Sequence, residues 1–380
     1  MTRINVMKPW LGPEEIAAVS EVISSGWIAQ GPRTAQFEAA FAARMEAGYA
    51  VAASSCTAAL HLALVSADIG PGADVVVPSF SFIATANAPT YVGARPVFAD
   101  VDPVTGNLTA ETVGAALTPA TRAVIAVDQG GMPVDLVPLR ALCDPLGITV
   151  LEDAACAAGT RYAGAPAGAG AEIAAWSFHP RKILTTGEGG MVTTSRPEWA
   201  ARARALREHA MSLSAAERSA SILAPAESYT EVGYNYRMTD LQAALGLVQL
   251  DRLDEVVRRR RELAAGYAKA FAEIEGLRAV TDPPWGESNF QSYWIEVLPE
   301  FGTDRNGVLQ ALAAEGISAR RGIMASHLEP AYRERDTGTA SLEVTERLSA
   351  NTLILPLFHE MTESEQARVI ETVAGIGRQP

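Results

Sequence analysis

The sequence has 380 residues, 48% of them apolar and 20% charged, which is typical of a globular protein and not of a disordered one. Its net charge of -13 argues against general nucleic-acid binding, because phosphate contacts need clustered Lys and Arg. No apolar run approaches the roughly 20 residues of a membrane span. The first ten residues lack a signal-peptide core, and three cysteines lack disulfide or metal-site spacing, so we expect a reducing cytoplasm and no metal.

The first half of the chain alternates between two kinds of segment. Short β-branched runs stand at Asp74–Pro78, Pro96–Val101, Ala123–Val127, Ile148–Asp153 and Met191–Thr194. Helical spacing is seen at Pro13–Ser24, Thr34–Met45, Thr57–Val65 and Val134–Cys143. Strands that alternate with helices predict mainly parallel pairing and a sheet covered on both faces.

The pattern changes near Met238. Met238–Ile274 reads as one long or broken helix, and a smaller α+β segment follows Pro283 and Pro284. Within the helix, we interpret Arg258–Arg261 as a solvated face, because acidic residues lie close by in the sequence. These features predict a large domain over residues 1–250 and a small one over 251–380, with the boundary somewhere in 250–280.

The most informative stretch is Trp176–Val192. A strand-like run leads to Ser177, His179 and Lys182, and a Gly-rich turn follows. A lone lysine before such a turn is usually a surface residue, but Lys182 is also a candidate nucleophile. A second apolar run ends in Glu152 and Asp153, where a side chain would face the ligand crevice of an open α/β sheet. Asp153 is a candidate metal ligand, general base, partner for a protonated ring nitrogen, or simple helix cap.

Two further segments bear on function. At Ser54–Leu64 a strand-like run passes into a helix whose first amides could bind phosphate, although capping by Ser55 or Thr57 explains the residues equally well. Gly233–Asp240 precedes the long helix and alone indicates only a capped loop. Together, a phosphate-type helix start, an acid at a strand end and a lysine before a Gly-rich turn fit pyridoxal phosphate.

With these motifs the chain resembles the DegT/DnrJ/EryC1/StrS family of pyridoxal-phosphate-dependent sugar aminotransferases. The resemblance runs over nearly the whole sequence, and its most specific part is Ser-Phe-His-x-x-Lys followed by Thr-Gly-Glu-Gly-Gly. The matching segments are Gly26–Pro32, Phe37–Glu38, Ser55–Leu60, Pro78–Thr85, Glu152–Ala155, Ser177–Val192, Tyr234–Met238, Gly316–Ile317, His327, Pro330 and Leu355–Pro356.

The resemblance implies the α/β fold of type I aspartate-aminotransferase-like enzymes, with a mostly parallel seven-stranded sheet in a large lobe and a small C-terminal α+β lobe. Lys182 matches the lysine that forms the internal aldimine and moves the proton, and Asp153 matches the acid at the pyridinium nitrogen. The cofactor site would also include Ser55, Cys56, Thr57, Phe82, Cys156, Ser177, His179 and Asn235. Phe82 would stack on the ring, and Asn235 would reach the phosphate of the neighbouring subunit in a homodimer.

Two positions depart from the family pattern. Cys156 stands where many members have Gln or His, and Asp128–Gly131 replaces a pattern that begins with His. We expect both positions to lie near the cofactor or substrate face. The lysine must be neutral to attack, so we also expect its pKa to be lowered by desolvation or nearby charge.

The resemblance implies transfer of an amino group from an amino acid, expected to be L-glutamate, to a keto group of a nucleotide-linked sugar, through pyridoxamine phosphate. A keto-cyclitol acceptor, a non-transaminating pyridoxal-phosphate enzyme and a binding protein without turnover stay open as alternatives. Positive charge for the nucleotide and contacts to the sugar are expected from Lys8, Trp27, Gln30, Arg33, Arg181, Arg237, Arg320, Arg321 and His327.

Overall fold

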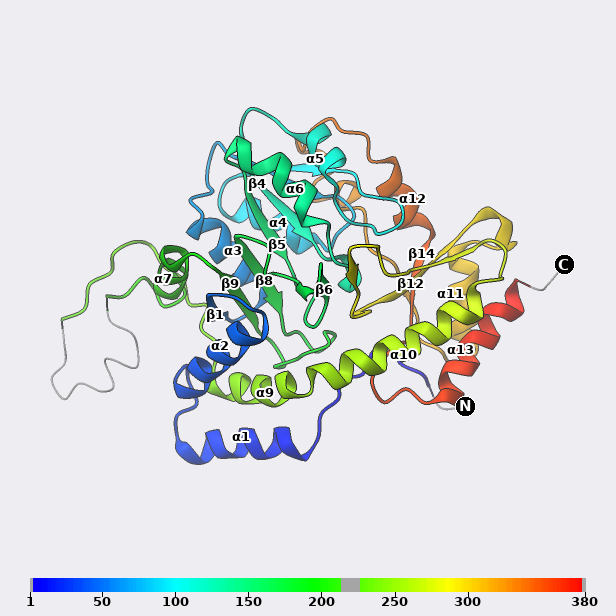
Figure 1. Cartoon of the computed structure of the whole chain (residues 1–380), viewed down its shortest axis with the longest axis horizontal. Coiled ribbons are helices and arrows are strands. Elements are labelled where there is room, and N and C mark those ends of the chain that lie inside the picture. The colour runs from blue at the N-terminus through cyan, green and yellow to red at the C-terminus, as the bar shows by residue number, and fades with distance from the viewer. Residues whose placement is uncertain (1–2, 213–225, 378–380) are drawn as a thin grey trace.

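The structure, a computed structural model, describes residues 3–212 and 226–377 (Figure 1). Its centre is a seven-stranded sheet in the order β1-β9-β8-β5-β4-β2-β3, in which only β9 runs antiparallel to its neighbours. The strands are β1 (Tyr49–Ala53), β2 (Asp74–Pro78), β3 (Arg95–Ala99), β4 (Thr121–Val127), β5 (Thr149–Asp153), β8 (Ile173–Ser177) and β9 (Gly190–Thr194). The prediction of a mostly parallel seven-stranded sheet is therefore confirmed.

Helices cover both faces of this sheet. Helix α3 (Cys56–Ser66) is apolar on nearly all sides, because it lies between the sheet and two neighbours, α4 (Ile83–Tyr91) and α7 (Pro197–Leu206). The opposite face carries α5 (Ala110–Ala116) and α6 (Leu136–Cys143). On that face, α2 (Pro32–Arg44) covers the end of the sheet formed by β1, β9 and β8, and it packs with α1 (Pro13–Ser25) against α9 (Asp240–Asp251).

The expected long helix is broken at Arg252 into α9 and α10 (Leu253–Phe271). Thr239 caps α9 through a capping box with Gln242. In Figure 1, α10 runs from the region of α9 towards the C-terminal sheet. Its first turns pack in the core that contains Trp176, whereas its last turns pack in a second core built around β12.

The C-terminal part has an antiparallel sheet in the order β10-β12-β14-β13, made of β10 (Leu277–Ala279), β12 (Tyr293–Val297), β13 (Arg320–Arg321) and β14 (Thr352–Leu355). It packs with α11 (Arg305–Ala314), α12 (Glu343–Asn351) and α13 (Glu363–Ile376). A small third sheet joins β6 (Arg161–Tyr162), β7 (Ala165–Pro166) and β11 (Gly286–Glu287). Ile4 packs in the C-terminal core, so we propose that the N-terminal segment belongs to this lobe and that the lobe boundary lies within α10.

One prediction about α10 is wrong. Arg258 and Arg261 do pair with acids near the surface, but Arg260 is 1% exposed. Its guanidinium donates to the carbonyl groups of Phe290, Gln291 and Leu357. The four consecutive arginines therefore point to different sides of α10: Arg258 and Arg261 lie near the surface, and Arg260 is buried against the C-terminal lobe.

Two features are absent from the described residues. None of their helices combines the length and apolar character that a membrane crossing requires. They also contain no grouping of His, Cys, Asp and Glu side chains that could hold a metal ion.

Candidate active site

Lys182 lies in a compact loop that joins β8 to β9. The loop is closed at its base, where the amide of Phe178 donates to the carbonyl of Gly189 at 2.9 Å and the amide of Thr186 donates to the carbonyl of Phe178 at 3.0 Å. A tight turn places the amide of Lys182 2.8 Å from the carbonyl of His179. This loop therefore begins and ends at the carboxyl end of β8, the edge where ligands bind in open α/β sheets.

The amine of Lys182 meets two residues from the end of β5. Its Nζ lies 3.0 Å from Sγ of Cys156, and its charge interacts with the carboxylate of Asp153. Asp153 is buried, and its Oδ2 accepts from the hydroxyl of Thr85 at 2.8 Å while its Oδ1 accepts from the amide of Ala155 at 3.2 Å. The lysine and the strand-end acid, far apart in the sequence, thus share one pocket.

Burial and charge together determine the proton affinities in this cluster. Burial raises the pKa of Asp153, although Thr85 and Lys182 act in the opposite direction. Burial alone would lower the pKa of Lys182, but the neighbouring Cys156, Cys56 and Asp153 outweigh it and the pKa is raised. Our expectation that the pKa of Lys182 is lowered is therefore wrong, because acidic groups surround the amine.

The start of α3 forms the floor beside these residues. Ser55 caps the helix by accepting from the amide of Ala58 at 3.1 Å, which confirms the capping interpretation. The amides of Cys56 and Thr57 precede the first helical hydrogen bond and point their dipoles towards the site. Phosphate binding and capping are compatible here, because they use different groups.

Gly190 connects the helix start to the lysine loop. It opens β9 and pairs with Ala53 of β1 on one side and with Ser177 of β8 on the other. A Cβ atom at this position would lie 2.4 Å from the carbonyl carbon of Ser55 and 2.7 Å from the amide nitrogen of Cys56. Glycine is therefore required for the β8–β9 turn to approach α3 so closely.

A model of the DegT/DnrJ/EryC1/StrS aminotransferase family matches residues 9–374. The chain belongs to this family. The structure resembles the aminotransferase TlmJ from Streptoalloteichus hindustanus, with 39% identity over 98% of each chain and a TM-score of 0.89. It also resembles DesI, solved in the presence of its TDP-sugar product, with 32% identity over 100% of this chain and 94% of that one and a TM-score of 0.89.

A third solved structure is the PLP form of Spr1654, a sugar aminotransferase from Streptococcus pneumoniae, with 27% identity, 99% coverage of each chain and a TM-score of 0.90. Family membership and these neighbours make the chain a pyridoxal-phosphate-dependent aminotransferase of fold type I. The predicted family, enzyme class, cofactor and fold class are confirmed.

The residues at the β8–α3 junction fit pyridoxal phosphate. The first amides of α3, which follows β1, and the hydroxyl of Ser177 at the end of β8 are suitable donors for a phosphate group, with only β9 between the two strands. The buried carboxylate of Asp153 is a suitable partner for a protonated ring nitrogen. Lys182 supplies the amine that an aldehyde requires.

We expect Gly190→Ala to weaken cofactor binding about tenfold or more. The added Cβ must displace the Ser55–Cys56 peptide, and overpacking of this kind typically costs about 1–3 kcal/mol. The dissociation constant can be measured by titrating the apoprotein with pyridoxal phosphate. Gly375→Ala is the matched control, since nothing lies within 4 Å of a Cβ there. Equal affinity of the two variants would contradict the role of this close approach.

Three further predicted cofactor residues occupy different positions around the site. Phe82 begins α4 with 58% of its surface exposed, and His179 accepts from the amide of Arg181 at 3.2 Å. Asn235 is exposed, but the carbonyl of the adjacent Tyr236 accepts from the amide of Ser54 at 2.7 Å. Asn235 is therefore held at the surface close to the start of α3.

The predicted substrate residues are only partly brought together. Arg320 acts electrostatically on His179 and so lies near the lysine loop. His327 lies against the end of β2, with its Nδ1 2.6 Å from Oγ of Ser79 and its Nε2 3.3 Å from Glu346. Four others have different partners: Lys8 pairs with Glu360, Arg33 with Glu21, Gln30 with Glu208, and Trp27 with the carbonyl of Gln30.

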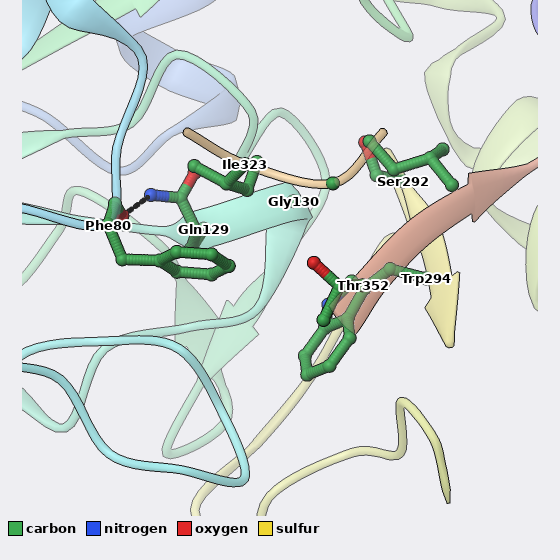
Figure 2. Close-up of a pocket in the computed structure, with 9 residues that line it drawn as sticks. Phe80, Gln129, Gly130, Ser292, Trp294, Ile323 and Thr352 are labelled. Atoms are coloured by element: carbon green, nitrogen blue, oxygen red, sulfur yellow. Dashed lines mark hydrogen bonds between the residues drawn. The ribbon is translucent and has the colours of Figure 1, made fainter. Parts of the chain in front are cut away.

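Of the two departures from the family pattern, Cys156 contacts Lys182 as expected, but Asp128 faces a different environment. Asp128 is fully buried, accepts from the amide of Val134 at 3.0 Å and interacts with the carboxyl group of Glu152. Its neighbour Gln129 donates to the carbonyl of Phe80 beside a cavity of about 10 Å³ (Figure 2). Asp128 nevertheless lies beside Asp153, because its amide donates to the carbonyl of Asp153 at 3.2 Å and the charge of Asp153 contributes to its raised pKa. The position is therefore next to the strand-end acid, while its carboxylate bonds to the main chain of Val134.

The Asp128–Glu152 pair predicts a specific pH dependence. Burial, together with Glu152, raises the pKa of Asp128 well above the unfolded value of 3.8. The native state therefore binds more protons than the unfolded state, and this contribution to stability is lost as the pH rises through the native pKa. Asp128→Asn, which mimics the protonated acid, should be more stable than wild type at pH 8 by about 1–3 kcal/mol and should lose that advantage near pH 4.

Urea unfolding at several pH values would measure this effect. Asp144→Asn is the control, because Asp144 forms an exposed pair with Arg140. A constant difference between Asp128→Asn and wild type across the pH range would contradict proton sharing by the buried pair.

Proposed function

We propose that the chain transfers an amino group from L-glutamate to a keto group of a nucleotide-linked sugar. When bound, pyridoxal phosphate supplies the electron sink for charge that develops at the α-carbon of the donor. In this proposal Asp153 would keep a proton on the ring nitrogen. Nζ of Lys182 would carry a proton between the α-carbon of the donor and the bound cofactor. The contact of Lys182 with Cys156 and its interaction with Asp153 support these roles.

The observation that favours an anionic sugar substrate is positive charge from Arg181 and Arg320 near the lysine loop. Burial is the main cause that lowers the pKa of His179; Glu188 acts in the opposite direction, and Arg181, Lys182 and Arg320 lower it further. Among residues 3–212 and 226–377, no carboxylate pairs with the side chain of Arg181, Arg237, Arg320 or Arg321. Unpaired guanidinium groups in a protein of net charge -13 suit a diphosphate. The TDP-sugar product of the related DesI supports the same substrate class.

We further propose a homodimer in which Asn235 reaches the cofactor phosphate of the partner subunit. The exposure of Asn235 beside the α3 start, and of Phe82, supports this arrangement. We also propose that the enzyme works in the cytoplasm, consistent with the free cysteines Cys56, Cys143 and Cys156.

The proposal can be tested with the enzyme loaded with pyridoxal phosphate. L-Glutamate is added first, and release of 2-oxoglutarate together with loss of the absorbance band of the lysine-bound cofactor reports the donor half-reaction. Three acceptors are then compared: a nucleotide-diphosphate keto sugar, the same sugar without its nucleotide, and a keto-cyclitol. We expect the nucleotide-linked sugar to give the highest kcat/KM.

Arg320→Gln tests whether Arg320 binds the phosphates of the nucleotide sugar. Loss of one charged contact to a phosphate is expected to raise KM for the nucleotide sugar about tenfold, since such contacts contribute roughly 1.5–3 kcal/mol, and to leave the glutamate half-reaction unchanged. A higher kcat/KM for the cyclitol or for the free sugar would refute the proposed substrate. Failure of every amino acid to change the spectrum would instead point to another pyridoxal-phosphate reaction.

A further inference from the structure

A short segment from the C-terminal half of the chain reaches into the active site. This segment, residues 289–292, which we term the strap, directly precedes β12. Its first two residues are buried, and Phe290 has a φ of 49° in the left-handed region, which is uncommon for a residue other than glycine. Phe290 keeps this conformation because its amide donates to Oγ of Ser288 at 2.9 Å and its carbonyl accepts from Arg260 at 2.7 and 3.0 Å.

Within the strap, Gln291 holds the main chain on both sides of Lys182. Its Oε1 accepts from the amide of Ile183 at 2.8 Å, and its Nε2 donates to the carbonyl of Arg181 at 2.7 Å. One end of the side-chain amide needs a donor and the other an acceptor, so the orientation of the amide is unambiguous. The two peptide groups that flank the Cα of Lys182 are therefore fixed by a single side chain.

Asn289 holds the main chain of Cys156, whose thiol contacts the amine of Lys182. Its Nδ2 donates to the carbonyl of Cys156 at 2.7 Å and to that of Ala158 at 2.9 Å. Its Oδ1 accepts from the main-chain amide of Gln291 at 2.7 Å, which ties the Asn289 side chain to the backbone that carries Gln291. The approach is close, because a Cβ on Gly131 would lie 1.9 Å from Oδ1 of Asn289.

The far end of the strap is attached to the large sheet. The amide of Ser292 donates to the carbonyl of Gly130 at 3.0 Å, and Figure 2 shows the two residues next to each other beside Trp294. The strap therefore contacts the segments that follow β4, β5 and β8, all at the carboxyl edge of the sheet. It is anchored from the opposite side by the buried Arg260.

We propose that Gln291, supported by Asn289, is a positioning residue for Lys182. It acts on the main chain and does not bond to the amine, and it keeps Nζ of Lys182 within 3.0 Å of Cys156 and next to Asp153. A catalytic amine must be placed to a fraction of an ångström, and a misplacement of 1 Å can slow a reaction about 10²-fold. The C-terminal lobe thus takes part in lysine chemistry without supplying a reacting group.

Gln291→Ala tests the proposal, with two independent readouts. In the apoprotein, amide hydrogen exchange of the Lys182–Leu184 peptide should become about tenfold faster, because the Ile183 amide loses its acceptor, while exchange in β2 stays unchanged. In the enzyme loaded with pyridoxal phosphate, kcat for the L-glutamate half-reaction should fall about 10²-fold, with KM within about twofold of wild type.

Gln366→Ala is the matched control, since Gln366 is another half-buried glutamine that donates to a main-chain carbonyl, that of Leu263. It should change neither readout. Gln291→Glu keeps the acceptor for Ile183 and loses the donor to Arg181, so it should lie between wild type and Gln291→Ala, and it replaces the alanine variant if that protein does not fold. A kcat within twofold of wild type, or faster exchange spread equally over β2, would overturn the proposal.

Discussion

Lys182→Ala is expected to lower the rate of amino transfer by about 10⁴-fold or more. Proton transfer by a positioned group alone contributes about 10²–10⁴-fold, and this variant also loses the amine that binds the cofactor. The sequence has three lysines, and neither of the others can substitute. Lys8 is paired with Glu360 and Lys269 is exposed on α10.

The fold and the phosphate site should survive this change. Asp153, Ser177 and the start of α3 are unaltered, so Lys182→Ala should still bind pyridoxal phosphate, without the absorbance band of the lysine-bound form. Lys182→Arg separates charge from proton transfer, because a guanidinium keeps its proton at neutral pH. It should be as inactive as the alanine variant, whereas Lys269→Ala should match wild type.

The measurement is kcat for the L-glutamate half-reaction, followed by stopped-flow absorbance. Residual turnover of Lys182→Ala within 100-fold of wild type would contradict the assignment and would require another base near Asp153. Full activity of Lys182→Arg would show that the side chain supplies only positive charge.

The acid cluster around Lys182 adds an expectation about protonation. Because Cys156, Cys56 and Asp153 raise the lysine pKa, the free amine is scarce in the apoprotein at neutral pH. Burial also raises the pKa of the Cys56 thiol well above its usual value, and Asp153 adds to this effect. The amine of Lys182 would therefore have to lose a proton before it could attack an aldehyde.

The sequence was sufficient to single out the two residues that we propose to carry the chemistry. Lys182 and Asp153 could be recognised because each stands at the end of an apolar run, beside a Gly-rich turn or an acid pair. The strands were predictable for a related reason: β2 is buried along its whole length, so its β-branched residues form an uninterrupted run. The antiparallel direction of β9 follows from the short connection after β8, which contains no crossover helix.

The supporting residues could not be predicted from the sequence in the same way. Gln291 lies 108 residues from Ile183, and a glutamine that bonds two main-chain groups leaves no recognisable spacing. Thr85, which donates to Asp153, falls within a segment that matches the family, but nothing in the sequence around it indicated contact with an acid. Such contacts depend on how the two halves of the chain pack, which local patterns do not encode.

Arg260 is the strongest example, because the sequence around it indicated a solvated helix face. Acidic residues flank the arginine run and do pair with Arg258 and Arg259. Only tertiary packing distinguishes Arg260, which meets the strap and the turn after β14 instead of solvent. Burial lowers its pKa to about 9, so the guanidinium stays charged at neutral pH, and among the described residues its partners are carbonyl oxygens and not carboxylates.

Arg260→Met is therefore expected to lower the free energy of unfolding by about 3–6 kcal/mol. The methionine fills most of the space, but the carbonyls of Phe290, Gln291 and Leu357 each lose a donor, and a buried group without a partner costs about 1–3 kcal/mol. Arg260→Lys should lose less, because its ammonium can still donate to one or two of these oxygens.

Urea unfolding of the apoprotein measures this difference, and Arg258→Met provides the control on the same helix. Arg258 forms an exposed pair with Glu262, so its loss should change the free energy by no more than about 0.5 kcal/mol. Equal stabilities of Arg260→Met and Arg258→Met would mean that the three carbonyls find other donors, and the strap would then not depend on this arginine. A large loss confined to Arg260→Met would show that the stability of the C-terminal lobe depends on the buried charge that holds the strap.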